Sequence, residues 1–176
     1  MAKKKASKKK MSSLCMIICM VLALVCIISA FLPVFSTKAV FGKSTSFLGH
    51  EFLTNLFEIK PESMEDLLVY GKIELLKTTD KSSAGTYMVM IGLLGGLVLG
   101  IGALVTSLWS FLLHNKLFRK LTTILFILLT LVSAILLIGT FVLMGNEIVK
   151  MVISVAPILM FIGAVSGTVC CVLIKK

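Results

Sequence analysis

Four long stretches without a charged residue constrain this chain more than any other feature of its sequence. They run from Met11 to Thr37, Ser82 to Leu113, Leu121 to Asn146 and Met151 to Ile174, and they hold 27, 32, 26 and 24 residues. A helix needs about 20 apolar residues to cross the hydrocarbon core of a bilayer. Because 58% of the chain is hydrophobic and the mean hydropathy is +1.07, we predict an integral membrane protein. Soluble enzymes, secreted disulfide scaffolds and disordered proteins are excluded.

The predicted fold is all-α, a polytopic bundle of four transmembrane helices with both chain ends on the cytoplasmic side. The predicted transmembrane helices cover residues 14–35, 87–113, 121–144 and 151–174. The segments between and beside them are a basic cytoplasmic tail (1–13), an extracytoplasmic segment (36–83), a cytoplasmic loop (114–120) and an outer turn (145–150). In layout alone this is similar to claudins and tetraspanins. Those families carry a tryptophan and cysteines in their outer loop, and residues 36–83 of this chain contain neither.

Charge sets the predicted orientation. With the N-terminus inside, the cytoplasmic segments hold eleven basic residues and no acidic one, whereas the outer segments hold seven lysines and all eight acids. Lysine and arginine concentrate beside short cytoplasmic loops, so this asymmetry favours the N-in/C-in arrangement. The lysine-rich start directly precedes an apolar span, so we expect it to lie against anionic lipid and not to bind nucleic acid.

The first span is predicted to be retained as a signal anchor. Its apolar run from Leu14 to Leu32 is longer than the 7–15 residues of a signal-peptide core. Cleavage after Ile28-Ser29-Ala30 is the alternative. The lysine-rich start, together with an outer segment free of cysteines and glycosylation sites, favours the plasma membrane of a bacterium as the location.

The outer segment is the one sizeable stretch predicted to lie in water. Its 48 residues are too few for an independent core, so we expect it to fold against the membrane or a partner. Apolar residues at helical spacing from Leu48 to Ile59 predict an amphipathic helix. After Pro61, the Ser63 and Asp66 pair predicts a second, short helix. Phe52, Leu56 and Phe57 are the predicted contacts with a partner protein or lipid.

Glycines mark the predicted helix-packing faces. Gly92, Gly96 and Gly100 recur at four-residue steps in the second span, and Gly163 and Gly167 do so in the fourth. Small residues let helices approach closely in lipid, where van der Waals contact drives association. We interpret both faces as packing surfaces within the bundle, with a homo-oligomeric interface and a binding groove or gate as the alternatives.

Other residues within the spans carry predictions of their own. Pro157 predicts a kink in the fourth span, since a proline inside a helix removes a backbone hydrogen bond. The third span has hydroxyls near one stripe that are placed to bond across helices, namely Thr123, Thr130, Ser133 and Thr140. The cysteines are interpreted as small packing residues, with acylation of Cys15 or Cys171, or a thiolate metal site, as alternatives.

No sequence motif predicts catalysis, a metal or a cofactor. The Gly42-Lys43-Ser44-Thr45 run lacks the first glycine of a phosphate-binding loop, and the spans contain no ionisable residue of the kind that marks ion-coupled transport. We therefore predict a non-enzymatic structural or accessory protein that presents its outer segment to a membrane-protein partner or to lipid. The alternative is a passive channel or small-solute permease formed by a homo-oligomer.

Overall fold

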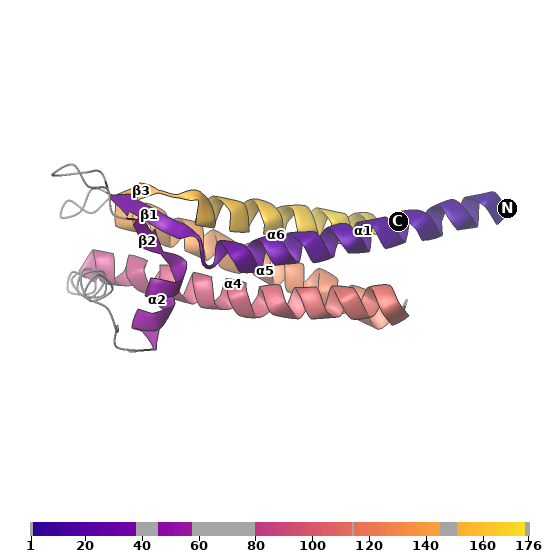
Figure 1. Cartoon of the computed structure of the whole chain (residues 1–176), viewed down its shortest axis with the longest axis horizontal. Helices are drawn as coiled ribbons and strands as arrows, with labels where there is room; N and C mark the ends of the chain where they lie inside the picture. Colours follow the sequence, from indigo (N-terminus) through magenta and orange to yellow (C-terminus); the bar gives the residue numbers. More distant parts are fainter. Residues whose placement is uncertain (1, 38–45, 58–79, 114, 145–150, 175–176) are drawn as a thin grey trace.

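The computed structural model describes residues 2–37, 46–57, 80–113, 115–144 and 151–174. Described residues are mostly helical, and the long helices lie side by side (Figure 1). In chain order the elements are α1 (Ala2–Ser29), β1 (Pro33–Thr37), β2 (Ser46–Leu48), α2 (Gly49–Leu56), α4 (Asp80–Leu113), α5 (Lys116–Met144), β3 (Met151–Ile153) and α6 (Val155–Ile174).

Three helices are long and apolar enough to cross a membrane. These are Ser83–Leu113 of α4, Lys116–Met144 of α5 and Val155–Leu173 of α6. The apolar part of α1, Ser13–Ser29, is shorter, although it packs alongside them. The three apolar helices are therefore compatible with an integral membrane protein.

The long helices form a closed ring of contacts. Helix α4 packs most extensively on α5, α1 contacts both α4 and α6, and α5 contacts α6. Large side chains fill the space that these helices enclose, and Leu93, Phe126, Leu129, Leu136 and Met160 are all fully buried. The described bundle therefore has a packed centre.

The outer faces of the long helices are apolar. Large exposed hydrophobic side chains occur along each of them, including Val21 on α1, Val98 on α4, Leu131 on α5 and Ile162 on α6. Soluble proteins rarely expose an apolar surface of this extent, because it is unfavourable in water. Hydrocarbon around the bundle removes that penalty.

A small antiparallel sheet, which the sequence analysis did not anticipate, lies at one end of the bundle (Figure 1). Its strand order is β2-β1-β3, with Phe35 opposite Phe47 on one side and opposite Ile153 on the other. The predicted first span ran to residue 35, whereas α1 ends at Ser29 and β1 begins at Pro33. Proline fixes φ and has no N–H, which suits the first residue of a strand better than the end of a helix.

The sheet also shortens the predicted fourth span at its start. Residues Met151–Ile153 form β3, and α6 begins at Val155 after the Ser154 N–H donates to the Val34 carbonyl at 3.0 Å. Pro157 therefore lies in the first turn of α6, where backbone N–H groups have no partner within the helix. The expected kink assumed a proline deeper in the helix, and this position does not require one.

Candidate functional site

The sheet and α2 form a folded layer at one end of the bundle, held by an aromatic cluster of Phe35, Phe47 and Phe52. The ring centroids of Phe35 and Phe52 are 6.0 Å apart, and those of Phe47 and Phe52 are 6.4 Å apart. All three side chains are fully buried. Tilted aromatic pairs at such distances add stabilisation beyond the burial of their area, and the three rings belong to the same hydrophobic core as the long helices.

Backbone contacts fix the start of α2. The Leu48 N–H donates to the Glu51 carboxylate at 2.7 Å, which is the return half of a capping box with Leu48 as the N-cap. The Gly49 N–H donates to the Leu32 carbonyl at 3.1 Å, and a Cβ at position 49 would collide with the Ala30 carbonyl. A glycine is needed there because the chain passes against the end of α1.

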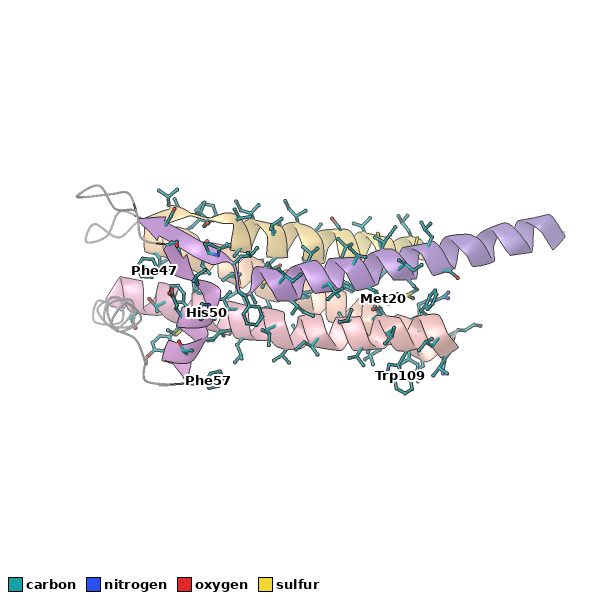
Figure 2. The ribbon with its side chains drawn as sticks, in the orientation of Figure 1. Met20, Phe47, His50, Phe57 and Trp109 are labelled. Carbon is teal, nitrogen blue, oxygen red and sulfur yellow. The ribbon has the colours of Figure 1, made fainter. Side chains whose placement is uncertain are left out.

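The three residues predicted to contact a partner or lipid lie in different environments. Phe52 is buried inside the aromatic cluster, so it contacts this chain and not a partner. Phe57, just beyond α2, keeps 60% of its surface exposed, and Figure 2 shows it at the side of the bundle. The side chain of Leu56 lies outside the described residues, as does the second helix predicted after Pro61. Of the three predicted contact residues, Phe57 is the one whose ring the structure shows exposed.

The three glycines of α4 that were predicted to pack each face a different helix. A Cβ on Gly92 would lie 2.7 Å from the Leu136 Cβ of α5, one on Gly96 would lie 2.5 Å from the Met160 sulfur of α6, and one on Gly100 would lie 3.0 Å from Ile27 Cγ1 of α1. Positions without a side chain on α4 therefore accommodate its two neighbours, α5 and α1, and the Met160 side chain that reaches from α6 across the centre of the bundle.

The glycines of α6 also lie at contacts within the chain. A Cβ on Gly163 would lie 2.9 Å from the Cys26 sulfur and 3.7 Å from the Leu22 carbonyl, both of α1. A Cβ on Gly167 would overlap the ring of Phe126 on α5. Four of the five predicted packing glycines thus lie between adjacent helices of one chain, and the fifth, Gly96, faces the Met160 side chain across the centre of the bundle.

Sequence reasoning missed Gly139 and, on the facing helix, Gly85, whose own Cβ would lie 3.0 Å from Leu143 Cγ. A Cβ on Gly139 of α5 would lie 2.7 Å from the Met88 Cβ and 3.0 Å from the Gly85 carbonyl of α4. Gly139 was overlooked because it has no glycine four residues away. The sequence feature that could have identified Gly139 is that it is the one glycine within α5, a helix built mostly from large apolar residues.

One hydroxyl of the predicted stripe bonds across helices. Thr130 Oγ1 of α5 and Thr168 Oγ1 of α6 are 3.0 Å apart. Both hydroxyls also lie near a carbonyl of their own helix, Thr130 Oγ1 2.8 Å from the Phe126 carbonyl and Thr168 Oγ1 3.0 Å from the Ala164 carbonyl. Each hydroxyl has one proton, so one of the two donates across the helices while the other donates within its own helix. The hydroxyls of Thr123, Ser133 and Thr140 donate to carbonyls three or four residues earlier in α5. Such local bonds satisfy a hydroxyl in an apolar environment without joining two helices.

The cysteines gather where α1 and α6 meet. The Cys19 and Cys171 sulfurs are 3.5 Å apart, and the Cys26 thiol donates to the Met160 carbonyl at 3.7 Å. All five cysteines are free thiols. Within the described residues, no group of three or more histidine, cysteine or acidic side chains could hold a metal ion.

Two features remain as candidates for function: the exposed Phe57 side chain beyond α2, and the buried thiol pair between α1 and α6. The apolar parts of the four long helices, Ser13–Ser29, Ser83–Leu113, Leu121–Met144 and Val155–Leu173, contain no ionisable acid, base or histidine. Comparisons with protein-family models, with curated proteins and with solved structures found no match to this chain.

Proposed function

We propose that this chain is an accessory membrane protein, which crosses the bilayer four times and presents its outer layer to another membrane protein. Helix α1 is the fourth span in this proposal. Its apolar part, Ser13–Ser29, holds 17 residues and reaches about 25 Å at the α-helical rise per residue. That length is a few ångströms below a typical core thickness, which a bilayer accommodates by local thinning.

Charge supports an orientation with both chain ends in the cytoplasm. Both ends and the connection between α4 and α5 lie at one end of the bundle, opposite the sheet and α2 (Figure 1). The basic residues Lys116, Arg119 and Lys120 belong to that first end, together with the lysines of the N-terminal tail. Basic residues favour the cytoplasmic side, so the sheet and α2 are placed outside.

The packed centre is the observation that carries the accessory role. Met160 reaches from α6 to the bare backbone of Gly96 on α4, and Leu93, Phe126 and Leu129 are fully buried around the same interior. Because side chains fill the centre of a single copy, other molecules can contact its outer surface but cannot pass through it. A solute would have to pass between copies of the chain. The predicted packing glycines, however, already contact other helices of the same copy.

The first test compares two phenylalanines of nearly equal exposure. Phe57, beyond the end of α2, is 60% exposed. Phe141, on the side of α5 that faces away from the bundle, is 62% exposed. Phe57→Ser and Phe141→Ser are each expressed in the native host beside the unchanged protein. Complexes are extracted in mild detergent, and their composition is measured by mass spectrometry.

The accessory proposal expects a stoichiometric second membrane protein with the unchanged chain, reduced with Phe57→Ser and retained with Phe141→Ser. Equal loss with both variants would show a non-specific effect of removing an exposed ring. A homo-oligomer without another protein, combined with solute flux through liposomes that contain the purified chain, would refute the proposal in favour of a passive channel.

A further inference from the structure

The contact between Cys19 of α1 and Cys171 of α6 goes beyond the accessory role. Their sulfurs lie 3.5 Å apart, although 152 positions separate the two residues in sequence. Both side chains are buried, with 0% and 1% of their surface exposed. We propose that they are a disulfide-forming pair, which a hydroperoxide oxidises so that the first and last long helices become covalently joined.

The distance between the two sulfurs is short enough for bond formation with little movement. A disulfide bond is about 2.05 Å long, so the sulfurs must approach by about 1.5 Å. Rotation about the Cα–Cβ bond of a cysteine moves its sulfur by distances of this order. The two sulfurs are already each other's hydrogen-bond partner, so they point toward one another before oxidation.

The backbones of α1 and α6 are close as well. Two turns along α6, a Cβ on Gly163 would lie 3.7 Å from the Leu22 carbonyl of α1. Ala23, fully buried on α1, and Ala164, fully buried on α6, add small side chains to the same interface. A helix pair with bare and small residues in contact keeps the Cα–Cα separation small, as a disulfide requires.

The apolar surroundings favour a disulfide over a metal site. Two thiolates that hold a monovalent metal ion carry a net charge of −1, which is costly to bury in a low-dielectric interior. A disulfide is neutral and has no hydrogen-bond donor left unsatisfied.

The oxidation uses one hydroperoxide molecule for each pair. In the first step one sulfur attacks a peroxide oxygen, the O–O bond breaks, and the thiol proton leaves with the other oxygen as water or an alcohol. The attacking sulfur is then a neutral sulfenic acid. In the second step the other sulfur displaces that hydroxyl, which leaves as water with the second thiol proton. The two sulfurs lose two electrons in total, and the peroxide bond gains them.

The test uses the full chain in native membranes, with two matched variants. The first keeps only Cys19 and Cys171, with the other three cysteines replaced by alanine. The second keeps only Cys19 and Cys170, which places the second thiol one residue away on α6, partly exposed instead of buried. Membranes are treated with hydrogen peroxide and then denatured, and free thiols are counted with a maleimide that adds mass.

We expect the Cys19/Cys171 variant to lose two maleimide labels per chain after peroxide, and to regain both with dithiothreitol. The Cys19/Cys170 variant should keep its labels under the same treatment. Peptide mass spectrometry of the unchanged protein should find the Cys19 and Cys171 peptides linked, which does not depend on how well either variant folds. Equal protection of both variants, links only between chains, or no linked peptide in the unchanged protein would each overturn the proposal.

Discussion

Gly92→Ala tests whether close helix contact holds the bundle together. The new Cβ would lie 2.7 Å from the Leu136 Cβ and 2.9 Å from its Cα. Carbon atoms in van der Waals contact are about 3.5–4.0 Å apart, so α4 and α5 would have to separate locally by about 1 Å. The obstructing atoms belong to the backbone and its first side-chain carbon, so no rotamer change of Leu136 removes the overlap.

The matched control for this substitution is Gly102→Ala in the same helix. Its Cβ would lie 3.5 Å from the end of the Leu125 side chain, an ordinary contact. Both substitutions raise helix propensity equally, so that gain cancels when the two variants are compared. Overpacking typically costs about 1–3 kcal/mol, and we expect Gly92→Ala to be less stable than Gly102→Ala by about that amount.

Fluorescence of Trp109 gives the measurement. It is the single tryptophan, it lies toward the end of α4 away from the sheet (Figure 2), and its ring centroid is 5.9 Å from that of Phe118 on α5. Its emission should therefore report the separation of α4 from α5 as detergent-solubilised protein is unfolded with increasing dodecyl sulfate. Coincident unfolding curves for the two variants would refute the reasoning that the Gly92 contact limits how closely the helices pack.

Three further predictions concern α2 with its buried Phe52, and the contact between Thr130 of α5 and Thr168 of α6. Phe52→Ala should lower the free energy of unfolding by about 3–5 kcal/mol, since it empties a fully buried aromatic site; a thermal midpoint equal to that of Phe57→Ala would contradict this. A double-mutant cycle of Thr130→Val and Thr168→Val should give a coupling of about 0.6 kcal/mol, and strict additivity would show that the 3.0 Å contact stabilises nothing. Glu51→Ala should destabilise α2 by about 1 kcal/mol, whereas Glu51→Gln should retain most of its stability, because an amide oxygen can accept the same bond; equal losses would exclude the capping box.

Hydropathy predicted the long helices because a membrane span is recognised from one segment alone. The sheet could not be predicted in this way. Its strands hold five, three and three residues, and two of them continue the apolar runs that also form α1 and α6. Apart from Pro33 at the start of β1, it is the pairing of Phe35 with Phe47 and Ile153 that distinguishes these residues from helix, and such pairing depends on segments distant in sequence.

The candidate sites could be predicted in part for a related reason. A four-residue glycine repeat identifies a close contact, as Gly92 and Gly96 illustrate, but does not specify which helix supplies the other side. Phe52 lies on the apolar side of an amphipathic helix, and such a side covers either a partner or the chain's own core. The aromatic cluster supplies that core from β1 and β2, which the sequence analysis had not identified as strands.

The order of the sheet has a consequence for how the protein is made. Its central strand, β1, emerges from the ribosome directly after α1, whereas its neighbour β3 emerges only after α4 and α5. Until then one edge of β1 has unpaired backbone groups, which are open to pairing with other chains. The outer layer therefore closes late in biogenesis, when α6 arrives and Ser154 bonds to Val34. A chain stalled before that point displays a strand edge that a quality-control protease or chaperone can distinguish from the finished protein.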